Sequence, residues 1–202
     1  MSILPIPEFF DADKVGSVWR IPYEERARQA RDWARLHKLE PASVDRTRTW
    51  LMLIDVQNTF CIPDFELYVG GRSGRGAVED NLRLCEYIYR NLGNITQITA
   101  TMDTHLTMQV FHAIFFVDSD GNHPAPYTDI HASELRAGKW MFNPALAGQF
   151  DAAPEYAQQM LIHYADELEK RGKYALTVWP YHAMLGGVGH SLVSSVGAAV
   201  CF

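Results

Sequence analysis

Several features that would place this chain in a broad class are missing from its sequence. No apolar run approaches the ~20 residues of a membrane-spanning helix. The N-terminus has no basic segment followed by an apolar core, which a secretory signal needs. Basic residues are in the minority, 18 against 24 acidic ones, and the net charge is −6. Because nucleic-acid binding needs a basic face, we expect a cytoplasmic protein that binds neither membranes nor nucleic acids.

Cysteine is scarce as well. The chain has three, Cys61, Cys85 and Cys201, and none of them stands in a CxxC pair. An odd number of cysteines in a chain without a secretion signal indicates free thiols in a reducing compartment. Internal repeats and low-complexity tracts are also absent. A length of 202 residues suffices for one domain with a substantial core.

The apolar pattern that is present predicts an α/β fold. Apolar runs at 50–56, 94–102 and 174–179 are typical of strands, and the first of them predicts a central strand buried on both faces. Helices are expected between these strands, over 77–92 and 154–171. Strand, helix and strand in this order form parallel βαβ units. We therefore expect a mainly parallel sheet.

The remaining segments define the expected organisation. Residues 1–47 form an N-terminal helical extension with a helix over 22–37, and residues 48–202 form the α/β domain. The segment 105–150 is rich in proline, glycine and aromatic residues and is expected to be a long functional loop. The C-terminal end, from Val196 to Phe202, is apolar. We expect either that the fold is incomplete at its C-terminus or that a partner subunit covers this surface in a homo-oligomer.

Metal-ligating residue types follow the predicted strands. Asp103 and His105 alternate after the second strand, so their side chains point to one face. His112 follows them, and His182 follows the third strand. Strand ends of a parallel sheet meet at one edge, and an aspartate with several histidines suits Zn²⁺, Fe²⁺ or Mn²⁺. The alternative is that these are ordinary polar loop residues, and His123 competes with His112 as a ligand.

Asp55 and two aromatic residues also lie at predicted strand ends. Asp55 directly follows an apolar run, where a carboxylate is costly to desolvate. It is either a general base whose pKa is raised by apolar surroundings or an aspartate that caps backbone N–H groups. Phe60 and Trp179 either hold a flat substrate ring between them or pack in the core.

Three motifs occur in a definite order along the chain. An apolar strand is followed by Asp55 to Phe60 (DVQNTF), then by Asp103-Thr104-His105 with His112, then by Trp179 to His182 (WPYH). These motifs resemble those of the isochorismatase-like cysteine hydrolases, and within them the nicotinamidase branch. The similarity extends over roughly residues 48–192.

This resemblance implies a Rossmann-like three-layer α/β/α fold and a Cys-Asp-Lys catalytic triad with Asp55 as the base. It implies hydrolysis of a small ring carboxamide such as nicotinamide to the acid and ammonia, through a Cys thioester. Gln57, Phe60 and Trp179 would bind the substrate. The implied ligands of the divalent metal are Asp103, His105, His112 and His182.

The sequence departs from the family pattern in its C-terminal part. In the family the triad lysine and cysteine follow the WPxH motif, but residues 183–202 contain no lysine, and Cys201 lacks the expected glycine-rich turn. Lys173 precedes the third strand, and Cys61 directly follows the first motif. We therefore expect this chain to lack two catalytic groups of a longer enzyme and to have little activity alone.

Two other functions stay open. One is a metal-hydroxide hydrolase that needs no cysteine and uses Asp55 as its base. The other is a non-catalytic binding subunit that keeps the same fold. Ala183 stands where nicotinamidases commonly have a cysteine, and the segment 106–150 is long, so a larger ring carboxamide is a further possible substrate.

Overall fold

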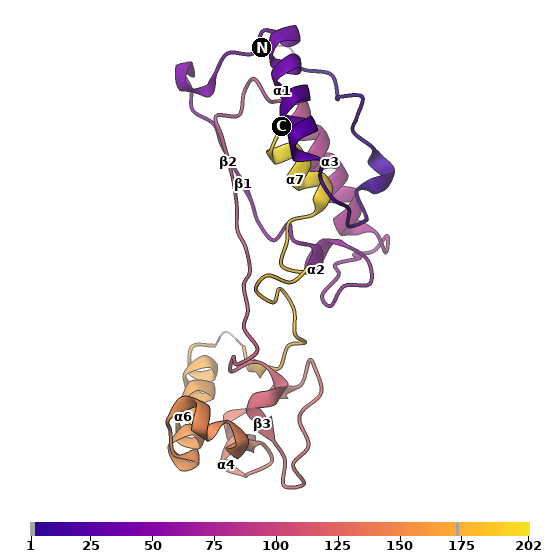
Figure 1. The fold of residues 1–202 in the computed structure, drawn as a ribbon. Helices are drawn as coiled ribbons and strands as arrows, with labels where there is room; N and C mark the ends of the chain where they lie inside the picture. The colour runs from indigo at the N-terminus through magenta and orange to yellow at the C-terminus, as the bar shows by residue number, and fades with distance from the viewer. Residues whose placement is uncertain (1–2, 173) are drawn as a thin grey trace. The chain divides into compact units, whose positions relative to one another are not determined.

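The computed structural model describes residues 3–172 and 174–202. The chain divides into two compact units. The first unit comprises the residues up to Thr104 together with Ala183–Phe202, and the second comprises His105–His182. Both contain helices and strands, which agrees with the α/β class (Figure 1). Among the described residues, none of the helices is long and apolar enough to cross a membrane.

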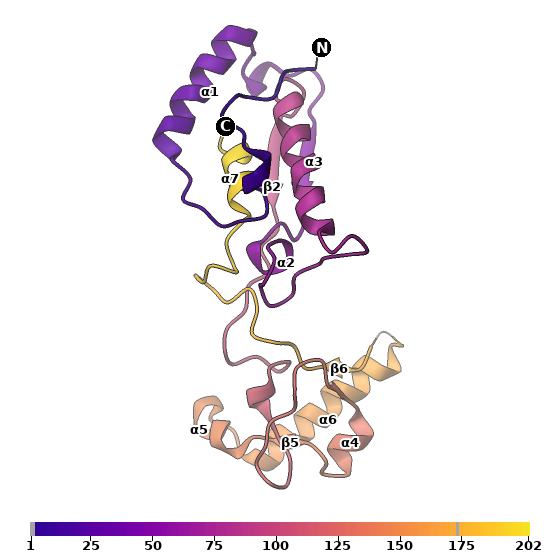
Figure 2. The same ribbon diagram turned by 90° about the vertical axis from the view of Figure 1, so that its right-hand side faces the viewer.

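The first unit is built on one parallel strand pair and the helices beside it. Strand β1 (Trp50–Leu53) pairs with β2 (Gln97–Ala100), in the register Trp50↔Gln97 to Leu53↔Ala100. Helix α3 (Gly76–Arg90) connects the two strands, as the sequence predicts. Helices α3 and α7 (Ser194–Val200) pack against each other on one face of the strand pair (Figures 1 and 2).

Helix α3 forms where its apolar residues recur at helical spacing. Val78, Cys85, Ile88 and Tyr89 are buried, and the last three belong to the core cluster of the first unit that contains Leu53. Glu79 lies in the first turn, where the positive end of the helix dipole stabilises a carboxylate. The expected helix over 77–92 is therefore confirmed, and its C-terminal end lies two residues earlier than predicted.

The other face of β1 differs from the prediction. Trp50, Met52 and Ile54 are exposed by 61%, 49% and 64%, whereas Leu53 between them is buried. The apolar run predicts burial on both faces, but α3 and α7 cover only the face that carries Leu53. Burial therefore alternates along this strand, and an apolar surface remains open.

The N-terminal segment belongs to the first unit. Its helix α1 (Tyr23–His37) has the predicted extent and contains no fully buried residue. The preceding chain is tied to α7, because the backbone N–H of Trp19 donates to Ser194 Oγ and its indole donates to Ser195 Oγ. The ring of Phe202 lies 5.0 Å from that of Phe9. The apolar C-terminal end is thus packed against the N-terminal segment.

The second unit is built from short antiparallel pairs around a core of aliphatic and aromatic side chains. Strand β3 (Phe116–Val117) pairs with β5 (Met141–Phe142), and β4 (Asp129–Ile130) pairs with β6 (Leu176–Thr177). Its main helices are α4 (Ala132–Arg136) and α6 (Pro154–Lys170). The buried core consists mainly of Phe116, Ile130, Leu135, Phe142, Leu146, Leu161, Leu176 and Val178.

Two predictions about this region are wrong. The run 174–179 was expected to join the first two strands in one mainly parallel sheet, but β6 pairs antiparallel with β4, and in the described residues only β1 and β2 pair in parallel. The segment 105–150 was expected to be a loop, but its aromatic side chains form much of the core of the second unit. Local pairing between Ile130 and Leu176 buries both side chains and fixes the partner of β6.

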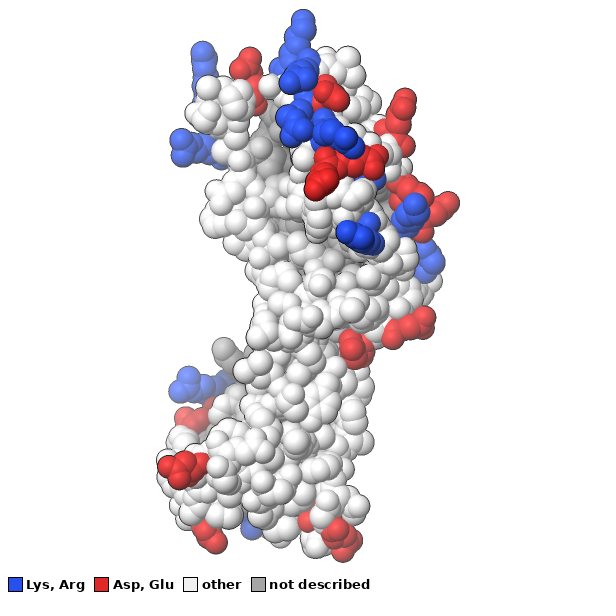
Figure 3. All heavy atoms as spheres, viewed as in Figure 1, with Lys and Arg blue, Asp and Glu red and all other residues white. Residues whose placement is uncertain are grey.

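Short helical elements complete the described chain. The 3-10 helices are η1 (Ala12–Lys14), η2 (Ala42–Val44), η3 (Ala113–Phe115) and η4 (Pro144–Leu146), and the one-turn α-helices are α2 (Asn58–Cys61) and α5 (Ala147–Phe150). Basic and acidic side chains are interspersed over the first unit (Figure 3), and this view contains no extended face of one charge.

Candidate metal centre

Three of the four predicted metal ligands lie together. Asp103, His105 and His182 each offer one ligand atom, and these atoms lie within 4.8 Å of one another. The ring centroids of His105 and His182 are 4.6 Å apart. Asp103 and His105 are separated by one residue just after β2, as the alternation of an extended chain predicts.

His182 is brought near His105 by backbone pairing within the second unit. His112 and Trp179 form a parallel β-bridge, and the N–H of Trp179 donates to the carbonyl of Phe111 over 2.8 Å. The ring of Phe111 in turn lies 4.9 Å from that of His105. Segments far apart in sequence are therefore held side by side at the point where the WPYH motif ends.

The hydrogen bond of His182 determines which nitrogen is available to a metal. Its Nδ1 lies 2.7 Å from the carbonyl oxygen of Pro180. A carbonyl oxygen only accepts, so Nδ1 carries the proton and Nε2 carries the lone pair. A backbone carbonyl that fixes the tautomer in this way is typical of metal-binding histidines.

His112 lies near these residues but outside the group of three. It is fully buried, and its Nδ1 donates to the carbonyl of Thr107 over 3.0 Å. Its Nε2 is buried and has no hydrogen-bond partner among the described residues. Burial lowers the pKa of His112, so the ring is neutral at neutral pH. Its centroid lies 6.1 Å from that of His105.

His123, the competitor of His112 in the sequence, does not join the group of three. Its Nδ1 lies 2.6 Å from the carbonyl oxygen of Phe116, within the second unit. Neither His112 nor its competitor His123 therefore belongs to the group of three.

Gln57 has a different place from the one expected. The resemblance implies that it contacts substrate, but its side chain is fully buried and both ends of its amide bond the backbone. Its Oε1 accepts from the N–H of Asp103 at 2.7 Å, and its Nε2 donates to the carbonyls of Asp103 and His190 at 2.9 and 2.8 Å. Gln57 therefore holds the peptide of a candidate ligand.

Asp55 is exposed, so the apolar surroundings that were expected around its carboxylate are not present. Its backbone has a φ of 59°, in the left-handed region that few non-glycine residues adopt. The N–H of Asp55 donates to Thr101 Oγ over 3.2 Å, and its carbonyl oxygen lies 3.5 Å from the Cys61 thiol sulfur. Ala183, directly after His182, also has a positive φ of 45°. The sequence contains no signal for these two conformations.

The two aromatic candidates belong to different units. Phe60 is half-buried and packs against the core of the first unit. Trp179 is 40% exposed in the second unit, with its ring 5.9 Å from Tyr127 and 6.3 Å from His182. Trp179 therefore flanks a candidate metal ligand.

Two of the three cysteines are poor nucleophiles. Cys61 and Cys85 are buried, and burial raises the pKa of both thiols, that of Cys85 to about 12. Both are therefore protonated at neutral pH. Cys201 is exposed. Lys173, the lysine that precedes the third predicted strand, lies outside the described residues.

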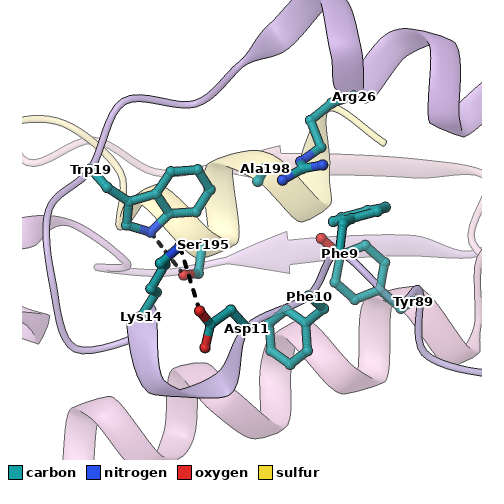
Figure 4. A pocket seen from close by; sticks show the side chains of 9 residues that line it. All are labelled: Phe9, Phe10, Asp11, Lys14, Trp19, Arg26, Tyr89, Ser195 and Ala198. Carbon is teal, nitrogen blue, oxygen red and sulfur yellow. Dashed lines mark hydrogen bonds and ion pairs between the residues drawn. The ribbon is translucent and has the colours of Figure 1, made fainter.

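A separate small cavity lies in the first unit between the N-terminal segment, α3 and α7 (Figure 4). It encloses about 50 Å³. Its charged groups already have partners, because Lys14 pairs with Asp11 at 3.5 Å and the Arg26 guanidinium lies 3.9 Å from the centroid of the Phe9 ring. These contacts fasten the N-terminal segment to the unit.

Comparisons with protein-family models, with curated proteins and with solved structures find no match for this chain. The relation to the isochorismatase-like hydrolases therefore remains a prediction from three sequence motifs.

Proposed function

We propose that this chain carries a divalent metal centre that serves the hydrolysis of a C–N amide bond in a small ring carboxamide. The observation that carries the proposal is the convergence of ligand atoms from Asp103, His105 and His182 within 4.8 Å. One carboxylate and two imidazoles form a mixed oxygen and nitrogen set that suits Zn²⁺, Fe²⁺ or Mn²⁺.

The local chemistry of the histidines fits such an ion. His182 presents Nε2 because its Nδ1 is bonded to a carbonyl, and neutral His112 keeps a buried Nε2 nearby. A bound divalent ion would polarise a carbonyl and lower the pKa of water. His112 would serve as a fourth ligand after a small shift of its ring, or as a polar neighbour of the bound substrate.

Two residues support a ring carboxamide as substrate. Trp179 presents an exposed indole beside His182, and aromatic faces bind planar rings. Asp55 is solvent-accessible and holds a strained backbone conformation, and such strain is concentrated at functional sites. We propose Asp55 as the base.

The route of hydrolysis has two forms. The resemblance favours a Cys thioester, with Asp55 deprotonating the nucleophile. Hydrolysis that depends on the metal and needs no cysteine is the second candidate, and the burial and raised pKa of Cys61 and Cys85 favour it. Alkylation of thiols in a longer protein that also carries the triad cysteine separates the two, because it should abolish activity on the first route and leave activity intact on the second.

Metal content measured beside ammonia release from a panel of ring carboxamides tests the proposal. We expect one equivalent of metal in the wild type and strong depletion in Asp103→Ala and His182→Ala. His123→Ala is the matched control, because it removes an imidazole of the second unit that lies outside the group, and it should retain the metal. Full stoichiometry in both ligand variants would refute the assigned site.

A further inference from the structure

We infer that Gln57 is the positioning residue of the metal centre, because it fixes the backbone of the ligand Asp103. The inference rests on the proposed function, since it assigns a role toward the same ion. Asp103 supplies the one carboxylate of the group. The side-chain amide of Gln57 bonds both the backbone N–H and the backbone carbonyl of Asp103.

The contact between the two residues closes a double hydrogen bond. Gln57 Oε1 accepts from the Asp103 N–H at 2.7 Å, and Gln57 Nε2 donates to the Asp103 carbonyl at 2.9 Å. The N–H and the carbonyl of one residue lie on the two sides of its Cα. Holding both restricts φ and ψ of Asp103 together and fixes the direction of its Cα–Cβ bond. Neither of these two bonds involves the carboxylate of Asp103.

A third bond anchors Gln57 itself. Its Nε2 also donates to the carbonyl of His190 at 2.8 Å, and His190 Nε2 lies 2.8 Å from Thr104 Oγ1. The residue after Asp103 is thereby tied to the same segment. Because the chain reaches His105 one residue later, the clamp lies directly before the second ligand.

The hydrogen bonds of the buried Gln57 amide argue against a role that is limited to filling the core. The side chain is fully buried, and burying an amide is unfavourable unless its polar atoms are hydrogen-bonded. Gln57 is also the N-cap residue of α2, yet its side chain makes no capping hydrogen bond to that helix. Its side-chain amide instead bonds Asp103 and His190.

Asn58 provides a matched control for a substitution at Gln57. It is also buried, and its Nδ2 donates to the carbonyl of Val188 at 2.7 Å, so it holds the same C-terminal segment. This bond does not involve Asp103. Gln57→Leu and Asn58→Leu each remove one buried amide, and only the first removes the clamp on the ligand.

The experiment measures the Zn²⁺ affinity of the full chain by competition with a chromophoric chelator. We expect Gln57→Leu to weaken Zn²⁺ binding by about 10- to 100-fold, the range for residues that orient metal ligands, and Asn58→Leu to change it by less than about 3-fold. In an Asp103→Ala background, Gln57→Leu should cause no further loss of affinity. Equal losses in Gln57→Leu and Asn58→Leu, or an undiminished loss without Asp103, would overturn the inference.

Two additions keep the test decisive. Gln57→Glu is the substitute variant if Gln57→Leu fails to fold. It preserves the size of the side chain but places a carboxylate oxygen against two carbonyl oxygens, so it should also weaken Zn²⁺ binding. Hydrogen exchange of the Asp103 amide needs no metal, and it should accelerate in the Gln57 variants and stay slow in Asn58→Leu. If the wild type binds no Zn²⁺, the proposed function fails, but the exchange measurement still tests whether Gln57 holds the Asp103 backbone. Unchanged exchange of the Asp103 amide in the Gln57 variants would refute that role.

Discussion

The two units support the candidate metal ligands in different ways. In the first unit, Asp103 follows a parallel strand and is held by the buried amide of Gln57. In the second unit, the histidines lie on irregular backbone between short strands, and carbonyl groups orient the rings of His112 and His182. The comparison teaches that regular secondary structure is not required to fix a ligand, provided that hydrogen bonds determine its backbone or its tautomer.

The cores of the units differ as well. The first is formed by aliphatic and sulfur-containing side chains on α3, α7 and β1, together with Tyr89. The second combines aliphatic side chains with the buried rings of Phe116 and Phe142, which lie on strands of two residues each. Short strands contribute few backbone hydrogen bonds, so the second unit depends more on side-chain packing.

Truncation of a central core residue gives the largest expected effect. Phe116 is fully buried, and Phe116→Ala should lower the free energy of unfolding by about 3–5 kcal/mol. Ile88→Ala, the matched change in the first unit, should cost about 2–5 kcal/mol. Urea unfolding followed by circular dichroism measures both values. A cost under about 1 kcal/mol for Phe116→Ala would mean that the second unit has no packed core.

The pH dependence of stability sharpens the comparison at His112. Burial lowers the pKa of this ring in the folded state. The unfolded chain therefore binds a proton below pH ~6.5 that the folded chain excludes. As the pH decreases below that value, the free energy of unfolding should fall by up to ~1.4 kcal/mol per pH unit, until the pH reaches the pKa of His112 in the folded protein.

Urea unfolding at pH 7.5 and pH 5.5 checks this sign. His112→Phe removes the titrating group while keeping a ring in its place, and it should flatten the pH dependence of the free energy of unfolding. His163→Phe is the control, because His163 is exposed on α6. An unchanged pH dependence in His112→Phe would contradict the lowered pKa of His112 in the folded protein.

Replacing either of two alanines by glycine should change the free energy of unfolding by a smaller amount, and in opposite directions. Ala183 has a φ of 45°, which costs a side-chain-bearing residue about 1–2 kcal/mol. Ala183→Gly should raise the free energy of unfolding by up to about 1 kcal/mol. Ala157→Gly, within α6, should lower it by about 1 kcal/mol because glycine is a poor helix former. Thermal unfolding compares the two, and destabilisation by both would contradict the strain at Ala183.

The smallest effect is expected at the surface. Arg35 and Asp32 on α1 lie 3.4 Å apart, and both side chains are more than 70% exposed. Arg35→Ala should change the free energy of unfolding by less than about 0.5 kcal/mol. A loss above 1 kcal/mol in urea unfolding would show that this helix carries more of the stability of the first unit than its exposure indicates.

The predictable parts of the fold are those that depend on local patterns. Helix α3 and the strands on either side of it follow from apolar spacing, and so do the limits of α1 and α6 within a few residues. The partner of β6 could not be predicted, because a run such as Tyr174 to Trp179 contains no information about parallel or antiparallel pairing. The burial of β1 on one face also depends on which helices cover it.

The candidate site was predictable to a similar extent. Alternation at Asp103 and His105 and the position of His182 after a strand were sufficient to select the group of three. The clamp by Gln57 was not predictable, because a glutamine in a motif is compatible with contact to a substrate or to the backbone. The exposure of Asp55 depends on chain segments that are remote in sequence.

X-ray absorption spectroscopy of the Zn²⁺-loaded protein tests the assigned metal centre most directly. We expect mixed oxygen and nitrogen ligation in the wild type, with imidazole scattering that decreases by one ring in His182→Ala. Identical spectra for the two proteins, or a wild-type spectrum without imidazole scattering, would contradict it.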